Sequence, residues 1–341
     1  MSNNIAEELQ IGKNENTIEI NELVKKFKDF VAVDSIDLQI HRGELFGLLG
    51  PNGAGKTTTL NILATLLPPT SGTAKINGFT LKEQNKIRHS IGFVFQDSTL
   101  DEELTARENL DIHGRLYHLP KNLRRQRIEE VLDLVELKDN QNRIVKTFSG
   151  GMKRRLEIAR GMMHHPKILF LDEPTLGLDP QTRRNVWNHI ENLNKEENLT
   201  IILTTHYLEE ADYLCNRIAI IDHGKIVAID SPGNLKKTIH SDILVLKTSH
   251  IKELVELFKE NQINEITVFE NSVNIATDKG EKIIPELLNL ASKNEISIDS
   301  VELKKSTLED VFIHYTGHQI RDSQASSADV LKNALKATGR F

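Results

Sequence analysis

The chain has 341 residues, of which 38% are hydrophobic and 27% charged, a balance typical of globular proteins. This length predicts about two domains. The net charge of −6 gives no basic footprint for nucleic acid, and no apolar run approaches the roughly 18 residues that span a bilayer. The single cysteine, Cys215, excludes an intramolecular disulfide, fits a reducing compartment and is expected to pack in the interior.

The first elements lead into a glycine-rich run. Residues 1–17 are polar, lack the apolar core of a signal peptide and are expected to form a flexible tail. Two strands are predicted over residues 17–27 and 32–40. A short buried strand over 44–50 and a helix over 57–67 then flank the glycine-rich run. Strand, glycine-rich loop and helix in this order form the arrangement that wraps a phosphate.

The glycine-rich run reads GPNGAGKTT and fits the pattern GxxxxGK[ST] of phosphate-binding loops. Its glycines permit close approaches that a Cβ would block, so the N–H groups of the loop can point at an anion at a helix N-terminus. Lys56 supplies a charge between the outer phosphates, and the Thr57 hydroxyl can hold Mg²⁺. A simple glycine turn is the alternative. The predicted nucleotide-binding residues are Gly50, Pro51, Asn52, Gly53, Ala54, Gly55, Lys56, Thr57 and Thr58.

The next segments predict an α/β core with a helical insert. A strand within residues 87–97 is expected to end at Gln96, and the chain is then helical to about residue 165. Thr105 and Glu108 have the spacing of a capping box. Four apolar residues share one face of a later helix: Ile128, Val131, Leu132 and Val135. Three buried strands follow over residues 168–173, 200–206 and 217–230, the last with a turn at His223–Gly224.

The pattern resets after DSPGN, residues 230–234, which predicts a domain boundary. The following elements have the order β-α-β-β-α-β, which suggests a ferredoxin-like domain. The apolar positions of its two helices are Ile251, Leu254, Val255 and Phe258 in the first, and Ile284, Leu287, Leu288 and Ala291 in the second. A final helix is expected to start at Ser306, with Glu309 completing a capping box.

Asp172 and Glu173 follow four apolar residues of a predicted strand. An acid at the C-terminal end of a strand beside a phosphate-binding loop is where Mg²⁺ is expected, and Asp172 fits that role. Glu173 lies one residue further and can reach a water instead. The alternative is a strand that merely reaches the surface.

The segment FSGGM, residues 148–152, opens another helix. Three small residues at this N-terminus suit an anion: Ser149, Gly150 and Gly151. Three cations follow at once: Lys153, Arg154 and Arg155. Cations in a first turn oppose the helix dipole. They are commonly a solvated basic face, but they also fit a phosphate that arrives from outside the subunit.

Together these segments resemble the motifs of ABC-transporter ATPase subunits: GPNGAGKTT, Gln96, FSGGM, LFLDEPTLGLDP and TTH, in that order. The resemblance covers about residues 18–230 and departs from the broad consensus at Phe148 and Met152. It implies an α/β P-loop NTPase core with a helical subdomain. The implied domains are a tail over 1–17, the ATPase over 18–235, a ferredoxin-like α+β domain over 241–317 and a tail over 318–341.

The resemblance also assigns roles to single residues. Two copies are expected to pair head to tail, so that Ser149, Gly150 and Gly151 bind the partner's ATP. Glu173 is expected to polarise the attacking water and His206 to hold the γ-phosphate. Gln96 is expected to sense the γ-phosphate and to contact Mg²⁺.

Two further roles concern the edges of the site. Asp179 is expected at the dimer seam. Phe27 is expected to stack on adenine, with Phe30 as its competitor.

The C-terminal segment STLEDVFIHYTGHQIRD resembles the daunorubicin-resistance subgroup of exporter ATPases. The implied function is an ATPase that uses ATP and Mg²⁺ and powers a separate membrane permease at the cytoplasmic face of the membrane. Drugs, antibiotics, lipids or polysaccharides are the expected cargo. The alternatives are a soluble ABC protein of translation or DNA repair and the ATPase of an importer. One P-loop, a compact insert and one cysteine argue against the soluble types.

Overall fold

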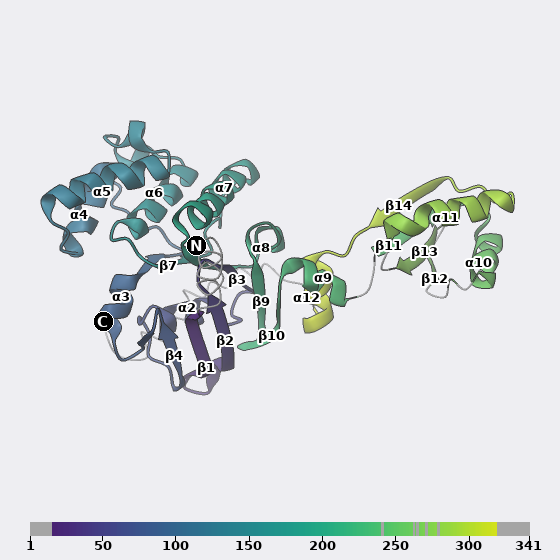
Figure 1. The fold of residues 1–341 in the computed structure, drawn as a ribbon, viewed down its shortest axis with the longest axis horizontal. Helices are drawn as coiled ribbons and strands as arrows, with labels where there is room; N and C mark the ends of the chain where they lie inside the picture. Colours follow the sequence, from purple (N-terminus) through teal and green to yellow (C-terminus); the bar gives the residue numbers. More distant parts are fainter. Residues whose placement is uncertain are drawn as a thin grey trace, which may run out of the picture. The chain divides into compact units, whose positions relative to one another are not determined.

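The computed structural model describes residues 16–239, 242–261, 263, 266–269, 272–277 and 280–318. These residues fall into two compact units, and the chain passes from one to the other between Asp230 and Ser231. Figure 1 shows the elements of both units. Most of the two predicted tails lies outside the described residues. No helix of the described residues is long and apolar enough to cross a membrane.

The first unit is built around a six-stranded sheet with the order β10-β9-β3-β8-β7-β6. Its strands are β3 (Leu45–Leu49), β6 (Ile91–Val94), β7 (Ile168–Asp172), β8 (Thr200–Thr205), β9 (Arg217–Asp222) and β10 (Lys225–Asp230). All neighbours are parallel except β9 and β10, which form the predicted hairpin around His223–Gly224. Every residue of β3, β7 and β8 is buried. Because these three strands are adjacent and parallel, their C-terminal ends meet at one edge of the sheet.

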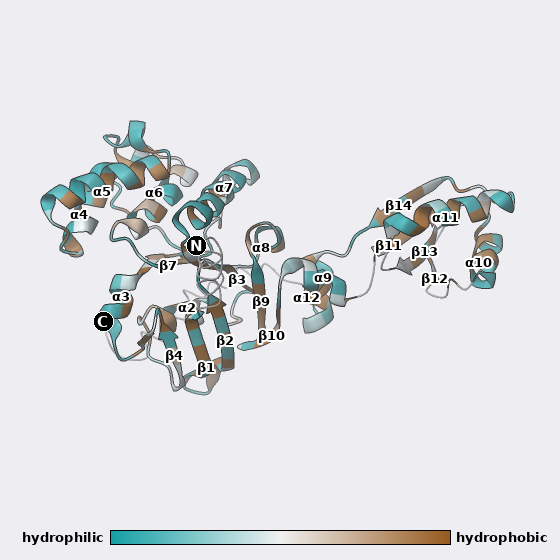
Figure 2. Ribbon diagram, in the orientation of Figure 1, coloured by the Kyte–Doolittle hydropathy of each residue, from teal (hydrophilic) through white to brown (hydrophobic). Residues whose placement is uncertain are grey.

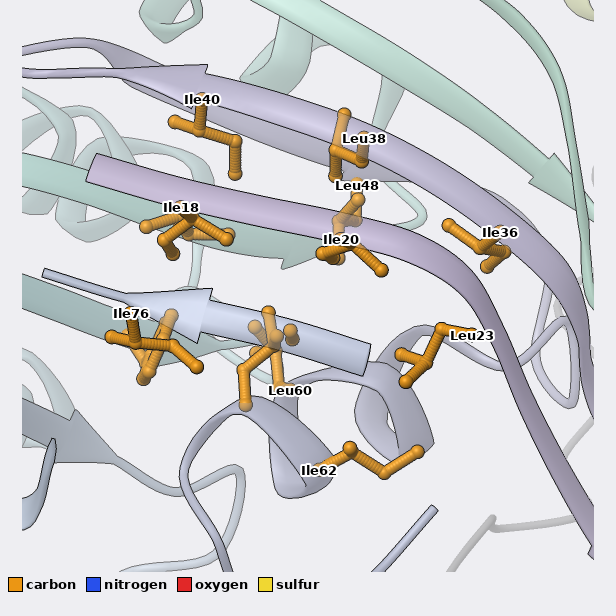
Figure 3. Close-up of a cluster of buried hydrophobic side chains, with 14 of the residues drawn as sticks. Ile18, Ile20, Leu23, Ile36, Leu38, Ile40, Leu48, Leu60, Ile62 and Ile76 are labelled. Carbon is orange, nitrogen blue, oxygen red and sulfur yellow. The ribbon is translucent and has the colours of Figure 1, made fainter. Parts of the chain in front are cut away.

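A second, antiparallel sheet covers the helix that follows β3. It contains β2 (Phe30–His41), β1 (Asn16–Phe27), β4 (Ser71–Ile76) and β5 (Phe79–Thr80), in that order. Hydrophilic and hydrophobic residues alternate along β1 and β2 (Figure 2), as expected for strands with one buried face. Figure 3 shows apolar side chains of these strands gathered with Leu48 of β3 and with Leu60 and Ile62 of α2 (Lys56–Leu63). This core holds α2 in place.

Helices complete the first unit. They are α3 (Gln84–Ser90), α4 (Ala106–Leu116), α5 (Lys121–Leu134), α6 (Gly150–Met162), α7 (Pro180–Glu197) and α8 (Leu208–Leu214). The predicted capping box of Thr105 and Glu108 is confirmed at the start of α4. The predicted apolar face of α5 is also confirmed, since all four of its residues are buried. Cys215 is buried after α8, and burial raises the pKa of its thiol well above the usual value.

The second unit has the predicted β-α-β-β-α-β order in β11 (Asp242–Lys247), α10 (Ile251–Glu260), β12 (Ile266–Phe269), β13 (Ser272–Thr277), α11 (Gly280–Lys293) and β14 (Ser300–Lys304). The sheet order β12-β13-β11-β14, antiparallel throughout, is that of a split β-α-β, so the ferredoxin-like prediction is confirmed. Leu254 and Phe258 of α10 and Leu287 of α11 pack in one core. The remaining helices are α9 (Pro232–Thr238) and α12 (Leu308–Thr316).

Four predicted details of local structure were wrong. The helix after the glycine-rich loop ends at Leu63 and not at residue 67, because the chain turns at Thr65, which has a φ of +61°. The strand before Gln96 already ends at Val94. Leu288 was assigned to the apolar face of α11 but is 38% exposed.

The fourth wrong detail is the start of the last helix, which begins at Leu308 with Thr307 as its N-cap. Asp310, and not Glu309, completes the capping box: its carboxylate accepts from the Thr307 N–H at 2.9 Å. Ser306 and Glu309 have the same spacing as this pair, so spacing alone placed the cap one residue early.

Two histidines are partly buried among the helices of the first unit. The rings of His164 and Tyr117 are stacked with centroids 3.8 Å apart, and the ring of His113 lies 6.4 Å from that of His164. Burial lowers the pKa of both His113 and His164 to about 4, while the contact of His164 Nε2 with the Ile91 carbonyl, at 2.8 Å, opposes this shift. The folded protein therefore resists protonation of these rings.

We predict that stability falls when the pH drops from about 6.5 towards 4. In this range the unfolded chain binds protons that the folded chain refuses, so the free energy of unfolding decreases by about 1–3 kcal/mol per histidine. Urea unfolding of His113→Gln and His164→Gln across this range should show a shallower pH dependence than the parent. His118→Gln, at an exposed position, is the control. An unchanged slope in both variants would contradict the assignment.

Candidate active site

The glycine-rich loop joins β3 to α2 and is packed so closely at its two ends that only glycine fits there. Gly55 has a φ of +104°, and a Cβ there would lie 2.3 Å from the Ala32 carbonyl oxygen. A Cβ at Gly50 would lie 2.2 Å from the Ile221 carbonyl oxygen. The backbone of β2 and β9 therefore presses against the loop from outside. This packing places the N-terminus of α2 at the C-terminal edge of the sheet.

Lys56, the first residue of α2, has a buried ammonium group that is 4% exposed. It donates to the carbonyl oxygens of Gly50 at 2.7 Å and Pro51 at 3.1 Å, and it lies 3.5 Å from Glu173 Oε1. Burial lowers the pKa of Lys56, although Glu173 and Asp172 act in the opposite direction. The amine is thus fixed at the loop, where a phosphate chain would meet it.

Two side-chain oxygens that suit a divalent cation lie together beside Lys56. Thr57 Oγ1 is 3.1 Å from Asp172 Oδ1, and the same carboxylate oxygen accepts from Thr204 Oγ1 at 2.5 Å. Burial raises the pKa of Asp172, against the effect of these two hydrogen bonds. Hard oxygen donors of this kind are what Mg²⁺ binds in nucleotide sites. A cation there would also compensate the buried carboxylate.

Glu173 follows β7 in a left-handed conformation, with a φ of +45°. Its N–H is held by Thr204, at 3.0 Å from the hydroxyl and 3.2 Å from the carbonyl oxygen. Its carboxylate lies 3.2 Å from Nδ1 of His206, which follows β8. Burial alone would raise the pKa of Glu173, but His206 and Lys56 together hold it below the usual value. Glu173 is therefore kept ionised, as a base must be.

The predicted anion site of the FSGGM segment lies at the start of α6. Ser149 is the N-cap of this helix, and its hydroxyl accepts from the Met152 N–H at 3.3 Å. Gly150 is exposed, while Gly151 is buried, with its Cα next to Thr182 of α7.

The three cations of α6 were interpreted as a solvated basic face or as support for an external phosphate. The structure corrects this interpretation. Lys153 pairs with Glu102, and Arg155 donates to the Val135 carbonyl oxygen at 2.9 Å. Arg154 is buried and bonds to carbonyl groups of the core. Their partners are thus found within this chain.

The remaining predicted residues lie on other elements. Asp179 is the N-cap of α7 and accepts from the Thr182 N–H at 3.0 Å. Phe27 and Phe30 pair at the hairpin end of β1 and β2, and Phe30 is 54% exposed. Gln96 is partly buried, two residues beyond the end of β6.

Sequence reasoning singled out the TTH motif but missed the contacts of Thr204, as it missed those of Arg154. Thr204 supplies a hydroxyl to both Asp172 and Glu173 from the neighbouring strand, which only the strand order reveals. The sequence held one indication that Arg154 is not a free surface charge. Glu157 lies three residues later on the same helix, a spacing at which opposite charges can pair.

A glycine-rich loop at a parallel strand, a buried lysine, and a threonine–aspartate pair with a glutamate beside it define a P-loop nucleotide hydrolase. Comparison with known proteins narrows this class. Residues 33–176 match the ABC transporter family, and residues 231–316 match the C-terminal domain of DrrA1-3-like ATP-binding proteins.

Individual relatives agree with these matches. The chain is 37% identical to the linearmycin resistance ATP-binding protein LnrL of Bacillus subtilis, over 89% of this chain and 100% of LnrL. It is 38% identical to the daunorubicin/doxorubicin resistance ATP-binding protein DrrA of Streptomyces peucetius, over 91% and 96%. The ATP-binding cassette MJ0796, solved as a dimer in a post-hydrolysis state with ADP and Pi, is 31% identical with a TM-score of 0.56, over 63% of this chain and 98% of that one.

The chain therefore belongs to the ABC transporter family, and it binds and hydrolyses ATP. Its C-terminal domain matches that of DrrA1-3-like ATP-binding proteins and its relatives include resistance ATP-binding proteins, which supports the ATP-binding subunit of an exporter over a soluble ABC protein or the ATPase of an importer.

We predict that Gly55→Ala is more destabilising than Gly53→Ala. Both glycines have a positive φ, +104° and +84°, so each alanine costs about 1–2 kcal/mol of backbone strain. The added Cβ meets the Ala32 carbonyl oxygen only at Gly55, since nothing lies within 4 Å of a Cβ at Gly53. Thermal unfolding without nucleotide should therefore show the lower Tm for Gly55→Ala. Equal Tm values would contradict this account of the loop.

Proposed function

We propose that this chain powers a separate membrane permease by hydrolysing ATP at a site shared between two copies. The observation that supports this most is the cluster at the C-terminal ends of β3, β7 and β8. There a buried ammonium, a paired hydroxyl and carboxylate, and a second, ionised carboxylate lie within 3.5 Å of their neighbours. Each has the chemistry that one step of phosphate binding or hydrolysis needs.

Each residue of the cluster has a separate task in this proposal. Lys56 and the loop amides bind the phosphate chain at the N-terminus of α2, where an anion is stabilised. Thr57 and Asp172 hold Mg²⁺, whose charge offsets that of the phosphates. Glu173 accepts a proton from the attacking water, and His206, whose Nδ1 lies 3.2 Å from the Glu173 carboxylate, is proposed to hold the γ-phosphate. Gln96 is proposed to sense the γ-phosphate and Mg²⁺.

The second copy completes the site in this proposal. The exposed N-cap Ser149 and the following Gly150 leave the start of α6 open to a ligand. The dimeric cassette MJ0796 supports the pairing of two such subunits. Asp179, at the start of α7, is proposed to lie at the seam, and Phe27 to stack on the adenine of its own copy.

The permease is a separate chain in this proposal, as the resemblance to the daunorubicin-resistance exporter ATPases implies. The ATPase would then act at the cytoplasmic face of the membrane through that partner. The resistance functions of LnrL and DrrA support an antibiotic or another drug as cargo. Reconstitution with the permease in vesicles, followed by ATP-dependent transport of such compounds, tests this part directly.

We predict that Glu173→Gln binds ATP but hydrolyses it about 10²–10⁴ times more slowly, because only the proton transfer from water is lost. Lys56→Ala should instead weaken binding, because the charge that meets the phosphates is removed. Equilibrium nucleotide titration and phosphate release measured on the same samples separate the two effects. Near-parental hydrolysis by Glu173→Gln would refute its role as the base.

We also predict that ATP, but not ADP, drives dimerisation of Glu173→Gln. Charge-assisted hydrogen bonds to a phosphate contribute about 1.5–3 kcal/mol each, and several at two sites offset an association cost of about 4–15 kcal/mol. Ser149→Arg in this background should abolish dimerisation and spare ATP binding, because its side chain blocks only the partner's phosphate. Light scattering with each nucleotide provides the measurement.

Ser149→Ala is the control for the helix cap. It removes the cap, which costs about 1 kcal/mol, but it leaves the space for the phosphate open. It should weaken the ATP-dependent dimer without abolishing it. A dimer that forms without nucleotide and survives Ser149→Arg would refute the shared site.

A further inference from the structure

Arg154 is a buried guanidinium in the second turn of α6, the helix that begins with the FSGGM segment. Its side chain is 8% exposed, and Glu157, which is 3% exposed, accepts from its Nη1 at 2.8 Å. The charge is thus compensated on its own helix. Every other contact of the guanidinium given by the structure is to a backbone carbonyl of another segment.

Two of these carbonyls flank Glu173. Nη2 of Arg154 donates to the Asp172 carbonyl oxygen at 2.9 Å, and Nε donates to the Pro174 carbonyl oxygen at 2.7 Å. Nε and Nη2 form one edge of a planar group with fixed donor directions. This edge therefore spans Glu173 and fixes the backbone on both sides of it.

Glu173 needs such support because its backbone is strained. A non-glycine residue at a positive φ is energetically costly and persists where the surroundings over-determine it. Thr204 of β8 holds the Glu173 N–H, and Arg154 holds the carbonyls on either side of this residue. Together they set the direction in which the Glu173 side chain leaves the strand.

The third contact reaches a different functional segment. Nη1 of Arg154 donates to the Phe95 carbonyl oxygen at 2.6 Å, and Phe95 immediately precedes Gln96. One side chain thus joins α6, the segment before Gln96 and the end of β7.

We propose that Arg154 is a positioning residue for ATP hydrolysis, which holds Glu173 and the Phe95–Gln96 segment in place from α6. The inference rests on the proposed role of Glu173 as the base. Arg154 does not touch the reacting atoms in this account. Lysine cannot replace it, because a single ammonium does not reproduce the planar edge that spans two carbonyls.

The chain offers a matched control in Arg127 of α5. The side chain of Arg127 is as buried as that of Arg154, at 7% against 8% exposed, and it also pairs with a glutamate three residues later, Glu130 at 2.7 Å. It too donates to a backbone carbonyl, that of Met162 at 2.9 Å. Neither contact involves a residue of the proposed site. Arg127→Lys therefore reports what the loss of a buried guanidinium does by itself.

The test compares Arg154→Lys with Arg127→Lys in the full chain. Arg154→Lys should lower kcat about 10- to 100-fold, because a displaced catalytic group loses rate steeply, while KM for ATP and equilibrium ATP binding stay within about twofold. Arg127→Lys should leave both kcat and KM near the parent. Thermal unfolding shows how much each substitution destabilises the fold, and similar losses in both variants would exclude stability as the cause of a difference in rate.

A double-variant cycle separates this inference from the proposed function. If Arg154 acts through Glu173, Arg154→Lys should slow Glu173→Gln little further in single-turnover hydrolysis, since the base that it positions is already absent. Near-parental hydrolysis by Glu173→Gln alone would overturn the role of Glu173. If Glu173→Gln hydrolyses ATP slowly, as predicted, but Arg154→Lys keeps the parental kcat, only the role of Arg154 is overturned.

A second variant covers the case that Arg154→Lys does not fold. Arg154→Met combined with Glu157→Gln removes the guanidinium together with the carboxylate that pairs with it. The amide oxygen that Glu157→Gln introduces can still accept from the Thr99 N–H, as the Glu157 carboxylate does at 3.0 Å. This double variant should show the same loss of kcat. A parental kcat in it, or failure of both variants to fold, would overturn the proposal in favour of a purely structural role.

Discussion

One buried ammonium group, that of Lys56, determines what the rest of the site must supply. A buried ammonium group has lost its hydration, so it is stable only if hydrogen-bond acceptors or opposite charges surround it. The carbonyls of Gly50 and Pro51 provide part of this environment, and Glu173 provides an opposite charge at 3.5 Å. These groups follow the C-terminal ends of β3 and β7, so the parallel order of the sheet is what allows the amine to be buried next to a phosphate-binding loop.

The two adjacent carboxylates show how the same burial produces two different groups. Burial raises the pKa of Asp172, whose partners are hydroxyl groups and which would gain most from a cation. Glu173 lies close to Lys56 and His206, which hold its pKa down in spite of burial. When their surroundings shift the pKa values of two acids in opposite directions, the two acids can perform different tasks in one site. Here they separate a metal ligand from a base.

The sequence was informative wherever a residue acts through its own segment. Alternation and helical spacing gave the strands, the face of α5 and the ferredoxin-like order, and the loop pattern gave the residues around Lys56. Contacts between segments were out of reach, because only the sheet order brings Thr204 beside Asp172 and only the packing of α6 brings Arg154 to Glu173. The cations of α6 were misinterpreted for that reason, since their partners are distant in sequence.

The central claim is that two copies of the chain enclose each nucleotide with the Lys56 cluster on one side and Ser149 on the other. A crystal structure of the chain with Mg²⁺ and a non-hydrolysable ATP analogue tests it most directly. The account predicts phosphate oxygens within hydrogen-bond distance of the Lys56 amine, the cation between Thr57 and Asp172, and Ser149 of a second copy at the γ-phosphate. A nucleotide enclosed by one copy alone, or phosphates bound away from Lys56, would contradict it.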